Sequence, residues 1–239
     1  MSARFQELDW RKTPMGELSL RRRYDPFFRA EVHEIKLDDE FLMSSLFTAA
    51  EIELARLALA ELQGTSELRV AVGGLGLGYT AQAVLESADI DSLVVVEALA
   101  EVIDWHREGL LPVGPSLTSD ARCRLEHGDF FATVDAGSGP TPNLGTRPFH
   151  AVIVDIDHSP RHLLHAGHAG LYTVKGLRHL SERLLLPDGI FALWSNDPPD
   201  EEFTGLLSEV FAEARAEVVA FPNPLQGNDA YNTVYLARS

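Results

Sequence analysis

The sequence contains a single cysteine among its 239 residues, Cys123, so a disulfide within the chain is excluded. No apolar run approaches the roughly 20 residues of a membrane-spanning helix, and Met1 is not followed by the charged and then apolar pattern of a secretory signal. No glycine-rich segment ends in Gly-Lys-Ser or Gly-Lys-Thr, the pattern of a nucleoside triphosphate site. A cytoplasmic protein that does not interact with a membrane is therefore expected.

Basic residues are also few. The chain has 20 lysines and arginines against 36 aspartates and glutamates, a formal net charge of −16. This balance argues against a nucleic-acid partner, because phosphates are bound by a basic face. An acidic protein would suit a cationic small-molecule substrate, although a solvated acidic surface would give the same composition. Hydrophobic residues make up 45% of the chain, which is enough for the core of one large α/β domain with a small appendage.

Residues 68–82, LRVAVGGLGLGYTAQ, form a glycine loop between a strand-like run and a helix-competent segment. The loop glycines are Gly73, Gly74, Gly76 and Gly78. Glycine lets the backbone approach a ligand closely, and the helix that follows offers free N–H groups. The spacing G-G-x-G-x-G is not the dinucleotide fingerprint, but a second apolar run ends in Glu97 about 20 residues later, where such folds bind a ribose. The two features predict an adenosine-bearing ligand, with a simple tight turn as the alternative.

The order of apolar and amphipathic segments predicts an α/β fold with a doubly wound, mainly parallel seven-stranded sheet. The strands of this sheet are expected at residues 70–72, 92–97, 123–127, 149–155, 189–194, 218–221 and 232–237. Its helices are expected at residues 47–62, 80–85, 98–111, 171–186 and 201–216. Two alternating runs, 17–24 and 30–37, indicate a small N-terminal β region. The expected domains are therefore residues 1–45 and 46–239, with an exposed Gly- and Pro-rich loop at residues 134–148.

Three acidic residues stand at or just past the carboxyl ends of successive strands: Glu97, Asp129 and Asp155. In an open parallel sheet the ligand lies beyond the carboxyl ends of the strands, so these three side chains should share one rim. Asp129 precedes two phenylalanines and would also suit the N-cap of a helix. The coincidence of all three acids with the glycine loop favours a ligand site.

The segments VAVGGLGLGYTAQ, VVVEALAEVIDW, HGDFFA and VIVDIDHSP, in this order and at these separations, resemble the spermidine synthase family within the class I S-adenosylmethionine-dependent methyltransferase superfamily. The resemblance covers residues 16–239 and implies a Rossmann-like methyltransferase fold. It implies S-adenosylmethionine, or its decarboxylated form, as the ligand. By this resemblance the loop glycines would cradle the methionine part, Glu97 would bind the ribose hydroxyls and Asp129 the adenine amino group. Asp155 would face the reacting amine.

Two departures from the family pattern bear on the reaction. The family's GGGDGG-like loop has an aspartate that anchors the aminopropyl amine, whereas this loop contains GLGLG and no acid. The family's Asp-x-x-Asp-Pro is here DIDHSP, beginning at Asp155. We therefore predict methyl transfer to an amine or other small polar acceptor, with Asp155 as proton acceptor and Asp157 and His158 assisting. Aminopropyl transfer to a polyamine is the alternative, and a nucleoside-binding protein without catalysis is a third.

Four histidines lie within eleven residues: His158, His162, His165 and His168. Helical spacing would let pairs of them meet as metal ligands, but no known metal-ligand spacing is matched. No metal site is therefore predicted, and a polar lid over the acceptor site is the favoured interpretation. The sequence is compatible with a homodimer.

Overall fold

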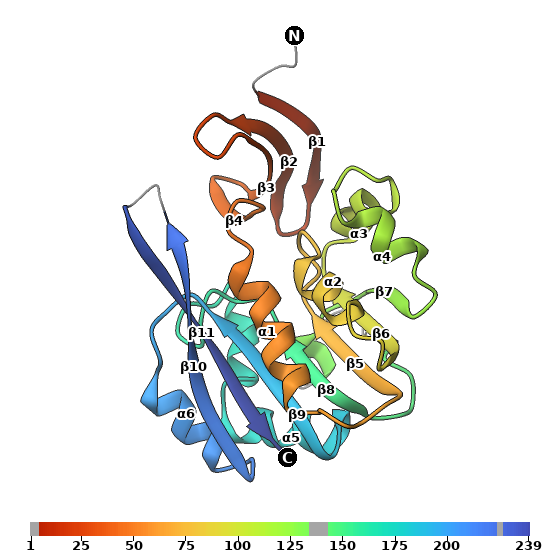
Figure 1. The fold of residues 1–239 in the computed structure, drawn as a ribbon, viewed down its shortest axis with the longest axis vertical. Helices are drawn as coiled ribbons and strands as arrows, with labels where there is room; N and C mark the ends of the chain where they lie inside the picture. Colours follow the sequence, from red (N-terminus) through yellow and green to blue (C-terminus); the bar gives the residue numbers. More distant parts are fainter. Residues whose placement is uncertain (1–4, 134–142, 224–226) are drawn as a thin grey trace.

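The computed structural model describes residues 5–133, 143–223 and 227–239, which contain two β-sheets (Figure 1). The larger sheet has seven strands in the order β10-β11-β9-β8-β5-β6-β7. Its strands are β5 Leu68–Gly73, β6 Ile90–Glu97, β7 Cys123–His127, β8 Phe149–Val154, β9 Leu185–Ser195, β10 Glu213–Asn223 and β11 Asn228–Arg238. Neighbouring strands are parallel except that β11 is antiparallel to both β9 and β10. The predicted doubly wound, mainly parallel sheet is confirmed.

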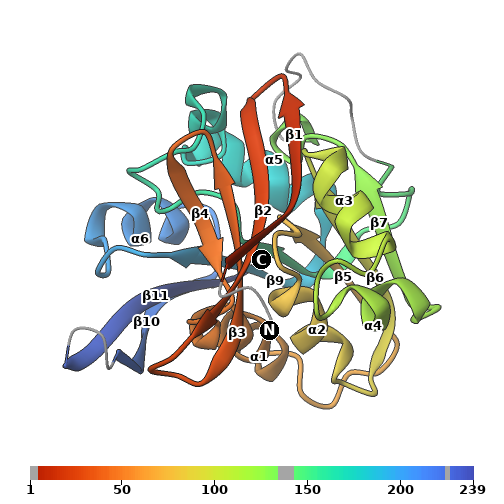
Figure 2. The same cartoon turned by 90° about the horizontal axis from the view of Figure 1, so that it is seen from above.

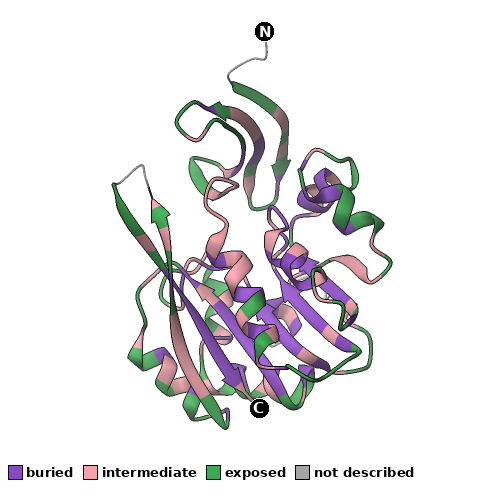
Figure 3. Cartoon of the chain, in the orientation of Figure 1, coloured by how far each residue is buried: buried purple, intermediate pink, exposed green. Residues whose placement is uncertain are grey.

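Helices cover both faces of the large sheet, so its strands form the buried centre of the molecule (Figure 3). One face packs against α1 Ala49–Ala60, α2 Tyr79–Leu85, α3 Ala100–Arg107 and α4 Gly114–Ser119. The other packs against η1 Phe131–Thr133, α5 Val174–Leu184 and α6 Glu201–Ser208. Along β5, Val70 and Val72 belong to the first core and Ala71 to the second. Because these strands are buried on both faces, their sequences are nearly continuous apolar runs.

The smaller sheet is antiparallel and lies above the larger one, over the ends of its strands (Figures 1 and 2). Its strands are β1 Phe5–Thr13, β2 Gly16–Asp25, β3 Ala30–Leu37 and β4 Glu40–Ser44. Leu18, Leu20 and Ile35 are completely buried and join the first core. Asp9 Oδ2 accepts a hydrogen bond of 2.7 Å from Nε1 of Trp105 on α3. These contacts fix the small sheet to the large one.

The small β region has four strands where the sequence indicates two. β1 and β4 lack a clear alternation of apolar residues, and only their pairing with β2 and β3 reveals them. The predicted helix 98–111 is also shorter than expected: α3 ends at Arg107, and the separate helix α4 follows it.

The predicted helix 201–216 is wrong in its second half. α6 ends at Ser208, and β10 begins at Glu213 and pairs antiparallel with β11. Alanine and glutamate favour a helix in this segment, but pairing along the sheet edge satisfies the same backbone groups and decides the conformation. The final hairpin is accordingly longer than the predicted strands 218–221 and 232–237.

Of the predicted exposed loop 134–148, residues 134–142 lie outside the described residues. In the part of the chain that the structure describes, no helix has the length and apolar character needed to cross a membrane.

Candidate active site

The glycine loop joins β5 to α2 in a sharp strand-to-helix turn, as the sequence predicts. Gly74 has a φ of +94°, and a Cβ atom there would collide with the carbonyl oxygen of Asp155. Gly78 has a φ of +91° and stands at the N-cap of α2. Side chains are strongly disfavoured at such backbone angles, so both positions require glycine. The Asp155 N–H also donates to the Gly73 carbonyl at 2.8 Å, so the loop and the end of β8 are in backbone contact.

Apolar side chains and one histidine hold the loop in place. Leu75 and Leu77 are 5% and 4% exposed and belong to the first core. His106 on α3 is completely buried, and its Nε2 lies 2.8 Å from the carbonyl oxygen of Gly76. A carbonyl can only accept, so the ring is protonated at Nε2, and burial lowers the pKa of His106. The middle of the loop is therefore anchored in apolar surroundings and carries no carboxylate.

Glu97 ends β6 and bonds to the backbone of the loop. Its Oε2 accepts hydrogen bonds from the N–H groups of Leu75 at 3.0 Å and Gly76 at 3.3 Å. Its Oε1 accepts one from the N–H of Leu99 at 2.9 Å. Burial raises the pKa of Glu97, and these N–H groups oppose the rise. The carboxylate thus ties the end of β6 to the glycine loop.

A cavity of about 550 Å³ runs across the carboxyl ends of the strands from β8 to β7. Gly74 and Asp155 line one end, Glu97 the middle and Asp129 the other end. The three acids therefore share one cavity, as their strand positions predict. Asp129 also accepts a hydrogen bond of 2.9 Å from the N–H of Phe131, so it caps the short helix η1 as well. The volume is in the range of small-molecule sites.

A second cavity of about 70 Å³ shares Asp155 and part of the glycine loop with the first. Its polar lining includes Glu51 on α1, Tyr79 and His158. The Thr80 hydroxyl donates a hydrogen bond of 2.6 Å to Asp155 Oδ2. Burial raises the pKa of Asp155 to about 6, and burial together with repulsion from Asp155 raises that of Glu51 to about 8. The two carboxyl groups of this cavity therefore stay protonated to a higher pH than ordinary aspartate and glutamate side chains do.

Sequence reasoning missed Glu51, although a signal for it exists. Within the predicted helix, Leu54, Ala58 and Leu62 are buried and follow Glu51 at three, seven and eleven residues. An acid on the apolar stripe of an amphipathic helix is costly unless it has a partner. Only the packing of α1 over the glycine loop shows that Glu51 lies in the same cavity as Asp155.

Stability should depend on pH through these two groups. The pKa values of Asp155 and Glu51 are raised from 3.8 and 4.5 to about 6 and about 8, so between about pH 4 and 8 the folded protein binds more protons than the unfolded chain. The free energy of unfolding should therefore fall as pH rises through this window. In Glu51→Gln the free energy of unfolding should decrease less over this pH range, as measured by urea unfolding at several pH values.

Glu53→Gln is the matched control, since Glu53 lies on the same helix with its side chain 40% exposed. It should follow the wild type. A Glu51→Gln protein with the wild-type pH dependence would show that Glu51 is not the group responsible.

Asp157 lines neither cavity. Its buried carboxylate accepts hydrogen bonds from the N–H of Leu164 at 2.7 Å, from Nδ1 of His168 at 2.8 Å and from the hydroxyl of Tyr172 at 2.8 Å. With three donors already in place, Asp157 organises the segment that follows β8. The structure therefore separates it from the cavity where the sequence expects it to assist Asp155.

The four histidines have different surroundings. His158 lines the smaller cavity, and its Nε2 lies 3.1 Å from Oε1 of Glu40. His165 and His168 line the larger cavity, and His162 lines neither. No cluster of three or more His, Cys, Asp or Glu side chains that could hold a metal occurs among the described residues.

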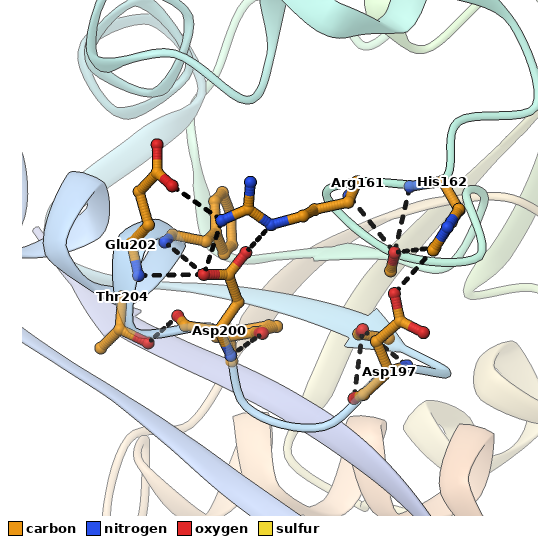
Figure 4. Close-up of polar contacts among 10 residues, drawn as sticks. Arg161, His162, Asp197, Asp200, Glu202 and Thr204 are labelled. Carbon is orange, nitrogen blue, oxygen red and sulfur yellow. Dashed lines mark hydrogen bonds and ion pairs between the residues drawn. The ribbon is translucent and has the colours of Figure 1, made fainter.

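The segment containing these histidines is tied to the turn after β9 (Figure 4). Arg161 pairs with Asp200 at 2.7 Å and with Glu202 at 2.8 Å, and Nδ1 of His162 lies 2.8 Å from Asp197 Oδ2. Asp200 also accepts hydrogen bonds from two N–H groups at the start of α6, which confirms that a helix starts here. These exposed contacts anchor the outer side of the segment, while its inner side forms the cavity walls.

The fold and the position of the cavities define the class: a Rossmann-like methyltransferase fold with an additional N-terminal β-sheet. No protein-family model matches the sequence. The chain is similar in structure to spermidine synthase from Thermotoga maritima, with a TM-score of 0.71 and 16% identity over 98% of this chain and 72% of that one. A spermidine synthase in complex with the transition-state analogue AdoDATO gives a TM-score of 0.70 and 15% identity over the same shares.

A predicted O-methyltransferase from Agrobacterium tumefaciens is also similar, with a TM-score of 0.52 and 22% identity over 79% of this chain and 80% of that one. At identities this low, the structural similarity establishes the fold alone. At the level of the fold the similarity to spermidine synthases is confirmed, and it extends over nearly the whole chain.

Proposed function

We propose that the protein is a transferase that moves the methyl group of S-adenosylmethionine to a small amine. The observation that carries this proposal is that Glu51 and Asp155 line one small cavity, which adjoins the larger one at the glycine loop. Two carboxyl groups in one cavity favour a cationic or proton-releasing acceptor. Asp155 lines both cavities, so its carboxylate would lie beside both the donor and the acceptor.

The acidic residues that line the larger cavity follow one another in an order that would match the parts of the donor. With the reacting carbon near Asp155, an extended adenosyl ligand would pass Glu97 with its ribose and place its base near Asp129. Gly74 and Gly76 line the larger cavity and have no Cβ, so the backbone there can approach the methionine part, whereas Gly73 lines neither cavity and Gly78 lines only the smaller one. The spermidine synthase bound to a transition-state analogue supports a donor of this kind.

The residues of the smaller cavity would supply alignment and a place for the proton. The sulfonium donor, when bound, supplies a methyl carbon that is open to in-line attack. The amine nitrogen forms the new C–N bond, the C–S bond breaks with its electron pair going to sulfur, and the amine proton passes to the carboxylate of Asp155. Glu51 would accept a hydrogen bond from the amine through a carboxyl oxygen, and His158 lies in the same cavity as a further proton acceptor.

The glycine loop favours methyl over aminopropyl transfer. Spermidine synthases resemble this chain but have an aspartate in the loop, and here the corresponding segment carries the buried Leu75 and Leu77. We expect calorimetric titration to show tighter binding of S-adenosylmethionine than of its decarboxylated form. Mass spectrometry with a panel of small amines should then detect a product with one added methyl group. Tighter binding of the decarboxylated donor would contradict the proposal.

Aminopropyl transfer is the second candidate, and Glu51 is the observation in its favour. This partly buried carboxyl group beside the loop could take the place of the missing aspartate and bind the aminopropyl amine. A longer polyamine formed from putrescine or spermidine would establish this reaction. Donor binding without turnover over a broad amine panel would instead favour a nucleoside-binding protein without catalysis.

A further inference from the structure

The end of the larger cavity nearest β7 is built from two segments that are distant in the sequence. Asp129 and Phe131 follow β7, and His168 comes from the segment after β8. The rings of His168 and Phe131 stack at a centroid distance of 3.7 Å with an interplanar angle of 11°. We define this group, Asp129, Phe131 and His168, as the base end of the cavity.

The imidazole of His168 is held in a fixed orientation. Its Nδ1 lies 2.8 Å from Oδ1 of Asp157, whose side chain is completely buried. Stacking on Phe131 fixes the plane of the ring, and the side chain of His168 is only 12% exposed. Because Nδ1 is engaged by a carboxylate, Nε2 is the nitrogen left for a ligand, and in the neutral ring it carries a lone pair.

We propose that His168 is a specificity residue that recognises a 6-aminopurine, and that Asp157 is its positioning residue. The 6-amino group has two N–H donors, and the base end offers two acceptors for them, the Asp129 carboxylate and Nε2 of His168. A 6-oxopurine has N1–H as its only donor at this edge of the base, so it can pair with at most one of the two acceptors and leaves the other facing its carbonyl oxygen. This inference rests on the proposed adenosyl donor and adds the residues that select its base.

The test compares two ligands that differ only in the base, S-adenosylhomocysteine and S-inosylhomocysteine, by calorimetric titration. The wild type should bind the adenosyl compound at least about tenfold more tightly, since one unpaired buried group costs roughly that factor. His168→Phe keeps an aromatic ring to stack on Phe131 but removes both nitrogens. It should weaken adenosyl binding about tenfold, change inosyl binding little and so reduce the ratio.

Asp157→Asn should reduce the same ratio by a smaller factor, because the ring remains but its orientation and tautomer are less well fixed. His162→Phe is the matched control, since His162 belongs to the same segment, is 70% exposed and lines neither cavity. It should leave the ratio unchanged. An unchanged ratio in His168→Phe would overturn the inference while leaving the proposed donor intact.

The outcomes separate this inference from the proposed reaction. If the wild type binds neither nucleoside, the donor class and the inference both fail. If it selects the adenosyl compound through His168 but transfers no methyl group to any amine, the inference stands and the proposed reaction fails.

Discussion

Asp155→Asn should reduce the turnover of the acceptor by about 10²- to 10⁴-fold, the usual contribution of a general base. The substitution keeps the size of the side chain, and Thr80 can still donate to the remaining carbonyl oxygen at the position of Oδ2. The backbone contact between Asp155 and the glycine loop is also unaffected, because it involves only main-chain atoms. Donor affinity should therefore change much less than the rate, and single-turnover kinetics with calorimetry would separate the two.

In the wild type the acid limb of the pH–rate profile should have an apparent pKa near that of Asp155, about 6, because only the ionised carboxylate accepts a proton. Asp89→Asn is the matched control, since Asp89 lies in an exposed turn before β6 and lines neither cavity. Wild-type turnover in Asp155→Asn would show that another group, such as His158, receives the proton.

Gly74→Ala should destabilise the folded protein by at least about 3 kcal/mol, the combined cost of a positive φ and a backbone clash. The added methyl group would collide with the carbonyl oxygen of Asp155, and backbone at this point cannot move away without separating β5 from β8. Urea unfolding followed by circular dichroism would measure the loss. Donor affinity should fall with it, because the same displacement deforms the glycine loop.

Gly205→Ala provides the control for the glycine substitution. Gly205 lies within α6, and nothing lies within 4 Å of a Cβ placed there. This variant should be more stable than the wild type by about 0.5–1 kcal/mol, because alanine loses less backbone entropy in a helix than glycine. Equal effects of the two substitutions would contradict the close packing of the loop against Asp155.

Several features of the fold follow from the sequence because they depend on local pattern. The large sheet has apolar side chains on both faces, so its parallel strands appear as short continuous apolar runs. The glycines mark the turn after β5, and the rule that ligands lie beyond the carboxyl ends of parallel strands places Glu97, Asp129 and Asp155 together. These inferences need only the order of the elements.

Other features depend on which elements pack against each other, and the sequence pattern does not contain that information. Glu51 lines the cavity of Asp155 only because α1 packs there, and β10 forms because β11 offers it a partner along the sheet edge. Asp157, which the sequence associates with catalysis, is instead enclosed by three hydrogen-bond donors from its own segment. Local periodicity thus determined the parallel strands of the large sheet and the rim of the site, whereas burial and hydrogen-bond partners, which arise only on packing, decided what each acidic side chain can do.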